Sequence, residues 1–95
     1  MGIKISRPCS EDPNEFIAEG SFGRSFSMRR LCSLLKKHVT DLKCSESLGV
    51  AKFEMDGRTV MLYRNGRIDI RRVKDLRDAK AIMTKIREMT NPAFE

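Results

Sequence analysis

The sequence contains no tryptophan, one tyrosine and one histidine among its 95 residues, and it has no long apolar run. A membrane-spanning helix needs roughly 18 or more apolar residues in succession, and no stretch approaches that length. The first residues, MGIKISRPCSEDP, also lack the apolar run of a signal peptide. We therefore expect no membrane partner and a cytoplasmic location.

Cysteines are few, and none forms a CxxC pair. Three is an odd number, which argues against a disulfide framework and suits a reducing compartment. The spacing C-x22-C-x5-H-x5-C matches no common zinc finger. We expect Cys32 to pack as a small hydrophobe and His38 to be structural. Cys9 and Cys44 remain as candidates for a metal or cluster site or for a reactive thiol.

Charge is present in excess and is unevenly distributed. The formal net charge is +6, and residues 58–87 hold ten Lys and Arg against three Asp and Glu, a net of +7. A field of this sign favours phosphate backbones, anionic cofactors or an acidic protein partner. No paired carboxylates and no Ser-His-Asp set accompany it, so we expect a binding module without a cofactor rather than an enzyme.

One compact domain over residues 1–95 is expected from a chain of this size with 40% hydrophobic residues. Residues 2–6 alternate like a strand, and 7–25 form a long loop in which 15–18 are a possible short edge strand. From Ser25 or Ser27, apolar residues recur at helical spacing as far as Leu42. A second helix begins at Asp75, with Asp78 completing a capping box, and ends before Pro92.

Between the helices, residues 49–73 read as three strands joined by tight turns. Asp56-Gly57 tolerates the positive φ angles of a two-residue hairpin turn. A three-residue loop at 64–66, with Gly66 left-handed in a bulge, keeps the apolar residues of both strands on one face. That inner face comprises Ala51, Phe53, Val60, Leu62, Ile68 and Ile70.

The expected order β-α-β-β-β-α gives an α+β fold, a two-layer sandwich with an antiparallel sheet and both helices on one face. The other face of the sheet carries basic, aromatic and acidic side chains. The candidates for binding nucleic acid or a partner there are Lys52, Met61, Tyr63, Arg67 and Arg71. The alternative is ordinary solvated surface, in which these cations pair across strands with Glu54 and Asp69.

Residues 59–86, TVMLYRNGRIDIRRVKDLRDAKAIMTKI, resemble one repeat of the archaeal TATA-box-binding protein. That resemblance implies a sheet whose bare face lies on nucleic acid. The paired phenylalanines that wedge base steps have no counterparts here, and only one repeat is present. The chain is also similar to small archaeal proteins, a likeness that implies a lone domain without supplying a role.

The stretch GSFGRSFSMRR, residues 20–30, places glycines, serines and arginines before a helix N-terminus, where free N–H groups favour an anion. It matches neither the P-loop nor the dinucleotide fingerprint. One interpretation is an anion site formed by Ser21, Arg24, Ser25 and Arg29; the other is a flexible turn whose serine caps the helix.

Three possible functions follow from these features. The first is RNA or DNA binding through the bare face of the sheet, aided by arginines of the segment 62–75. There the strand alternation places Arg67 and Arg71 outward and Arg72 in the inward phase, at the strand end. The second is a protein-interaction subunit in which Met61, Tyr63, Phe16 and Phe22 contact a partner. Metal or cluster binding by Cys9 and Cys44 is the third possibility.

Overall fold

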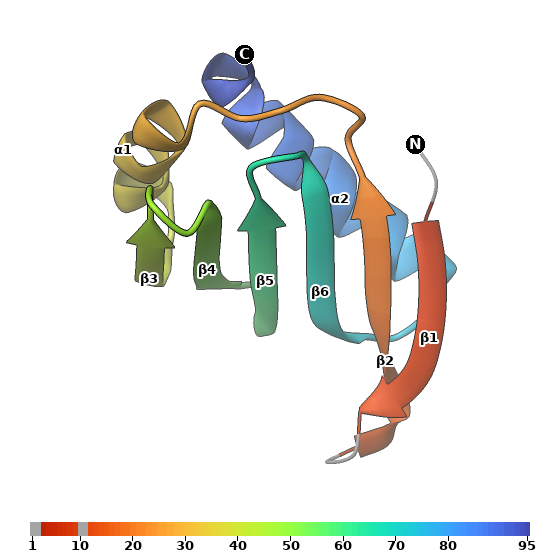
Figure 1. Ribbon diagram of the computed structural model, residues 1–95. Coiled ribbons are helices and arrows are strands. Elements are labelled where there is room, and N and C mark those ends of the chain that lie inside the picture. The colour runs from red at the N-terminus through yellow and green to blue at the C-terminus, as the bar shows by residue number, and fades with distance from the viewer. Residues whose placement is uncertain (1–2, 10–11) are drawn as a thin grey trace.

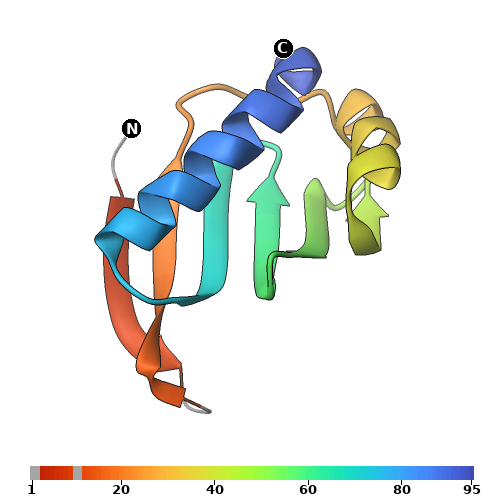
Figure 2. The same ribbon diagram turned by 180° about the vertical axis from the view of Figure 1, so that it is seen from behind.

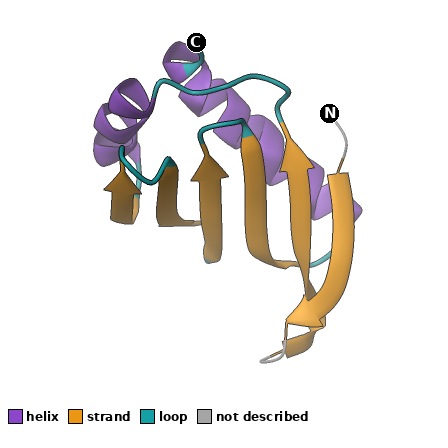
Figure 3. Ribbon diagram, in the orientation of Figure 1, coloured by secondary structure: helices purple, strands orange, loops and turns teal. Residues whose placement is uncertain are grey.

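The computed structural model describes residues 3–9 and 12–95, with the side chains of 3–5 and 16–95. Within those ranges it is an α+β fold in which six strands form one antiparallel sheet and two α-helices complete the domain (Figure 1; Figure 3). In chain order the elements are β1 (Ile3–Cys9), β2 (Asp12–Ser21), α1 (Met28–His38), β3 (Thr40–Ser45), β4 (Val50–Met55), β5 (Arg58–Tyr63), β6 (Arg67–Val73), α2 (Leu76–Thr90) and a 3-10 turn, η1 (Asn91–Ala93).

The sheet has the strand order β1-β2-β6-β5-β4-β3, and every neighbouring pair is antiparallel. Two of these strands are missing from the expected order β-α-β-β-β-α. The long loop expected over 7–25 contains β2, which lies inside the sheet between β1 and β6 and is not a short edge strand. The second additional strand is β3, formed by residues that helical spacing had assigned to the end of the first helix.

The six inner-face side chains expected from the meander are all fully buried. They share one hydrophobic core with the buried stripe of each helix, which consists of Met28, Leu31 and Leu35 in α1 and of Ala79, Ile82, Met83 and Ile86 in α2. Figure 2 shows α2 running diagonally across this side of the sheet, whereas α1 lies beside β3 at the end of the strand order. We call the side that faces the viewer in Figure 1, which α2 does not cross, the outer face.

The two tight turns that fix the register of the meander are as predicted. Asp56 and Gly57 both have positive φ, at 53° and 75°, and join β4 directly to β5. Gly66 has φ 91°, its N–H donates to the carbonyl of Tyr63 at 2.9 Å, and Leu62 lies opposite Ile68. The alternation that separates inner from outer side chains is therefore the predicted one through β4, β5 and most of β6.

The first helix is shorter than its apolar pattern predicts. It ends at His38, and Val39, where the chain turns extended, donates its N–H to the carbonyl of Leu35 at 3.0 Å. Val39 and Leu42 therefore lie in the helix cap and in β3, although their spacing also fits a helix. This early end lets the chain reverse and add β3 beside β4.

The second helix is capped almost as predicted. The Asp75 carboxylate accepts from the Asp78 N–H at 2.8 Å. The Asp78 carboxylate returns not to Asp75 but to the N–H of Lys74 at 3.0 Å, and it also forms an ion pair with Arg58 of β5. Burial raises the pKa of Asp78, but these hydrogen bonds and the Arg58 charge outweigh it and leave that pKa below its ordinary value. The start of α2 is thereby tied to the sheet.

Candidate functional site

The outer face gathers side chains from five strands in register. Asp69 of β6 lies opposite Met61 of β5 on one side and opposite Glu19 of β2 on the other. Met61 lies in turn opposite Lys52 of β4, which lies opposite Lys43 of β3. Since directly opposite residues of antiparallel strands point to the same face, these five side chains form one row across the sheet.

Next to this row, Tyr63 and Arg67 are held by Asp69. The Tyr63 hydroxyl donates to one carboxylate oxygen of Asp69 at 3.2 Å, and Nε of Arg67 donates to the other at 3.2 Å. The Arg67 guanidinium carbon lies 5.5 Å from the centroid of the Tyr63 ring and approaches the carboxylate of Glu19 within 3.8 Å. Arg67 is therefore engaged within the protein, and its guanidinium lies over an aromatic ring.

The same contacts set the protonation of the tyrosine. Burial raises the pKa of Tyr63, and the charge and hydrogen bond of Asp69 raise it further, while Arg67 and Arg71 act in the opposite direction. The net pKa lies above the ordinary value of a tyrosine. Tyr63 therefore stays neutral at neutral pH and keeps its hydroxyl directed to Asp69.

A hollow of about 390 Å³ lies beside this cluster, over β2, β6 and β5. Seven residues line it: Ile17, Glu19, Thr59, Met61, Tyr63, Asp69 and Arg71. Arg71 is exposed, and its guanidinium forms no hydrogen bond or ion pair with another described residue. Lys52, in the neighbouring row, is likewise exposed and unpaired among the described residues. The hollow thus combines apolar side chains, an aromatic ring and two carboxylates with a cation that no described residue pairs with.

The five outer-face candidates named from the sequence all lie on this face, but Ile17 and Glu19 of β2 were not expected there. The signal for them is the alternation of Phe16, Ile17, Ala18 and Glu19, in which Ala18 is fully buried and Ile17 faces the hollow. The alternation is weak because both sides of β2 carry apolar residues.

Arg72 also lies on the outer face, and its expected inward phase is wrong. Ile17 lies opposite Arg71 and Phe16 opposite Val73, so Arg72 is an extra residue in β6. It has φ 65°, as in a bulge, and this re-aims its side chain. The guanidinium donates to Glu54 at 3.2 Å, Thr59 at 3.0 Å and the Gly57 carbonyl at 3.0 Å. Arg72 therefore joins three strands instead of reaching around the sheet edge.

The residues named for an anion site at the start of α1 do not converge on it. Ser21 accepts from the N–H of Gly23 at 3.1 Å, and the Arg24 guanidinium lies 4.9 Å from the ring of Phe94 and donates to the carbonyl of Glu95. The carbonyl of Ser25 accepts from the N–H of Glu95 at 2.9 Å. This loop therefore holds the C-terminal segment, and Arg29 lies apart, exposed on α1.

The expectation of unpaired cysteines is wrong for two of the three, because Cys32 of α1 and Cys44 of β3 form a disulfide. Had the helix continued to Cys44, the separation of 12 positions would have kept the two cysteines roughly 18 Å apart along its axis. The reversal at Val39 brings them together. The bond removes Cys44 as a metal ligand and removes the basis for expecting a reducing compartment. The side chain of Cys9 lies outside the described residues.

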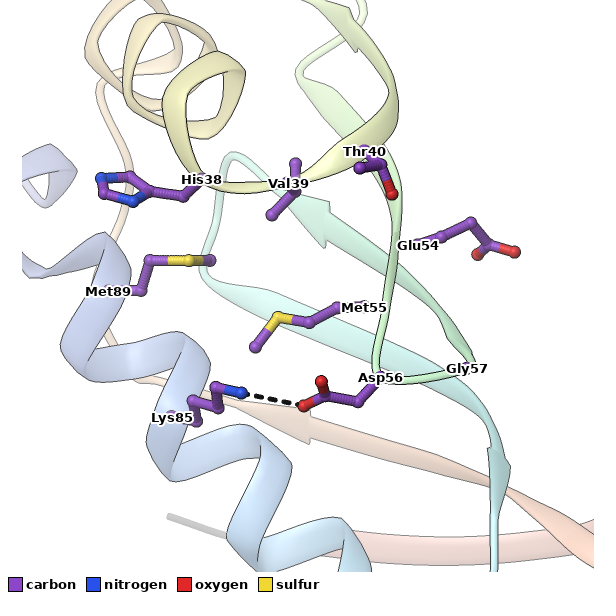
Figure 4. Close-up of a pocket in the computed structure, with 9 residues that line it drawn as sticks. All are labelled: His38, Val39, Thr40, Glu54, Met55, Asp56, Gly57, Lys85 and Met89. Carbon is purple, nitrogen blue, oxygen red and sulfur yellow. Dashed lines mark hydrogen bonds and ion pairs between the residues drawn. The ribbon is translucent and has the colours of Figure 1, made fainter.

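A second groove, of about 530 Å³, lies between α2, the end of α1 and the β4–β5 turn (Figure 4). In Figure 4 the thioethers of Met55 and Met89 extend into it, and the imidazole of His38 points away from them. Lys85 and Asp56 form an ion pair of 2.9 Å across it. The Lys85–Asp56 ion pair therefore holds the turn against α2, and the charges of these two side chains are paired with each other.

No protein-family model matches the chain, and no curated protein or solved structure does either. Within residues 3–9 and 12–95, no group of three or more His, Cys, Asp or Glu side chains could hold a metal ion. None of the described helices is long and apolar enough to cross a membrane.

Proposed function

We propose that the domain binds single-stranded nucleic acid on its outer face, with a base in the hollow beside Tyr63. The observation that carries this proposal is the hollow itself, which places Arg71, a cation that pairs with no described residue, next to a ring and apolar side chains. Its volume falls within the range of small-ligand sites. Sheet faces that bind single strands combine cations for the phosphates with surfaces on which bases stack.

Each side chain has a distinct part in this proposal. Arg71 and Lys52 bind phosphates, since neither forms an ion pair with a side chain that the structure describes. A base in the hollow packs against the ring of Tyr63, because Tyr63 lines the hollow and aromatic rings accept bases. Met61 supplies apolar contact at the floor. The resemblance of residues 59–86 to the TATA-box-binding protein and the cytoplasmic location both stay predictions, and the proposal depends on neither.

The single tyrosine provides the test, because without tryptophan its emission reports on this hollow alone. Titration with oligouridylate of about 16 nucleotides should quench Tyr63 emission, and the affinity should fall with salt. The double variant Arg71→Gln with Lys52→Gln should lower the slope of log affinity against log salt by about 1.4, since each phosphate contact on a single strand contributes about 0.7.

The matched control is Lys80→Gln with Arg87→Gln, which removes two exposed charges from α2. Its slope should equal that of the parent. An unchanged Tyr63 emission and no salt-dependent binding to RNA or DNA of any form would refute the proposal. Equal loss of slope in both double variants would show that only net charge matters.

An acidic protein partner is the second candidate, favoured by the exposed cations Arg71 and Lys52 beside the apolar side chain of Met61. One of its expected contacts is already used, since the Phe22 ring packs edge-on against Phe26 at 6.3 Å and Phe94 at 5.8 Å. Polyglutamate distinguishes the two functions. It should compete with oligouridylate if charge alone drives binding, but it cannot quench Tyr63 by stacking.

A further inference from the structure

Helix α1 is charged in a way that α2 is not. Its 11 residues include four Lys and Arg and no carboxylate, whereas the 15 residues of α2 hold four Lys and Arg with Asp78 and Glu88. Nothing on α1 itself therefore offsets its positive charge.

These four cations share one exposed surface, which we call the α1 basic face: Arg29, Arg30, Lys36 and Lys37. At 100° per residue they span about a third of the helix circumference around Ser33, opposite the buried stripe. Among the described residues, the one internal hydrogen bond from these side chains joins Arg30 to the carbonyl of Pro92 at 3.4 Å. The other three cations extend into solvent.

Two arrangements here are unfavourable for the free protein. Arg29 and Arg30 occupy the first turn of α1, where the helix dipole disfavours cations, and that turn has no acidic residue and no side-chain cap from Ser27. On the sheet, Lys43 lies directly opposite Lys52, and like charges in that position repel. Local arrangements that oppose stability are expected where a surface serves binding.

The two arrangements are adjacent in space. The Cys32–Cys44 disulfide fixes α1 to β3, and β3 carries Lys43 next to Lys52 of β4. Figures 1 and 2 both show α1 next to β3, at the end of the sheet. Cys44 lies opposite the buried Ala51, so the disulfide holds α1 at the inner side of β3, and the cations of the outer face lead to α1 around the β3 edge of the sheet.

We infer that the α1 basic face is a second phosphate-binding surface, which takes the strand that leaves the hollow over Lys52 and Lys43. This inference rests on the proposed function, and it adds that the same nucleic-acid strand extends beyond the hollow as far as α1. A charged lipid surface shares the phosphate chemistry, but α1 has no apolar stripe left to insert, because Met28, Leu31 and Leu35 are buried in the core.

The test compares two oligouridylate probes, one of about four nucleotides and one of about 16. The α1 variant is Arg29→Gln with Lys36→Gln; these positions are seven apart on one face, and their dipole effects oppose each other. This variant should bind the short probe as the parent does. For the long probe, its slope of log affinity against log salt should be smaller than that of the parent by about 1.4. Arg29→Lys with Lys36→Arg keeps the charges and should keep the parent slope.

Lys80→Gln with Arg87→Gln is the matched control, because it removes two charges at the same spacing from α2. The inference is overturned if the α1 variant leaves the long-probe slope unchanged, or if this control lowers it equally. Binding of phosphatidylserine vesicles that is lost in the α1 variant, with unchanged RNA binding, would assign the face to lipid instead. If the parent binds neither probe, the proposed function fails together with this inference. If only this inference fails, both probes still quench the emission of Tyr63.

Discussion

Replacing Gly66 by alanine should destabilise the domain more than any other glycine substitution in a turn of the meander. Gly66 has φ 91°, and a Cβ built on it would lie 2.1 Å from the carbonyl oxygen of Arg24. That oxygen belongs to the backbone and cannot rotate away as a side chain would. The substitution therefore has to push the segment 22–26 off the turn that joins β5 to β6.

The magnitude follows from three contributions. A left-handed conformation costs a non-glycine residue about 1–2 kcal/mol. The displaced segment is held by two hydrogen bonds, from Phe22 N to the Gly66 carbonyl at 3.0 Å and from Phe26 N to the Arg64 carbonyl at 2.7 Å, and each contributes about 0.5–1.5 kcal/mol. Alanine recovers about 0.4–1 kcal/mol by restricting the unfolded chain. The expected loss in free energy of unfolding is about 2–4 kcal/mol.

Gly57→Ala is the matched control, because Gly57 has φ 75° but nothing within 4 Å of a Cβ. It should cost only the left-handed conformation less the same recovery from the unfolded chain, at most about 1.5 kcal/mol. Urea unfolding of both variants with the disulfide intact gives the comparison. If Gly66→Ala costs no more than Gly57→Ala, the close approach of the Arg24 carbonyl does not constrain the turn, and the reasoning is wrong.

Two further substitutions and the reduction of the disulfide test other parts of the structure. Lys43→Glu should raise the free energy of unfolding by about 0.2–1 kcal/mol, because it replaces repulsion with attraction opposite Lys52. If urea denaturation gives a lower free energy of unfolding for this variant than for the parent, the result contradicts the observed register. Reduction of the Cys32–Cys44 disulfide should lower that free energy by about 2–4 kcal/mol, and equal unfolding curves with and without reductant would exclude the bond. Asp78→Asn should cost about 1–2 kcal/mol at neutral pH. Because the folded pKa of Asp78 is lowered, the parent keeps this stabilisation above about pH 4 and loses it as pH falls through the folded pKa, so the two proteins should converge in acid-unfolding measurements.

The meander could be predicted from the sequence because its signals are local. Alternating apolar residues and the two glycine turns fix which residues of β4, β5 and β6 face the core, and the structure agrees at all six inner positions. The outer-face candidates followed from the same alternation. Their ion pairs could not be predicted, because Arg67 is engaged by Asp69 on its own strand and by Glu19 of β2.

The remaining strands were missed because their patterns are ambiguous. Val39 and Leu42 continue the helical spacing of α1, yet Leu42 and Cys44 also alternate as in a strand, and pairing of β3 with β4 decides between the two. The disulfide depends on that decision. In β2, Ile17 faces the hollow while Ala18 is buried, so no clear polar side marks the strand. Arg72 turns outward through a bulge with positive φ, and the sequence gives no signal for that bulge because the residue is not a glycine.

Two unfavourable placements of cations distinguish the proposed binding role from a simple need for solubility. They are Lys43 opposite Lys52, and Arg29 with Arg30 in the first turn of α1. A basic surface that serves solubility works equally well with its charges spread out, as they are on α2 among acidic neighbours. Cations placed opposite each other and at the wrong end of a helix dipole lower stability in the free protein, and a polyanion that lies across them removes both penalties. Substitutions there should therefore leave stability equal or improve it while weakening RNA binding, whereas surface charges that serve solubility should affect neither.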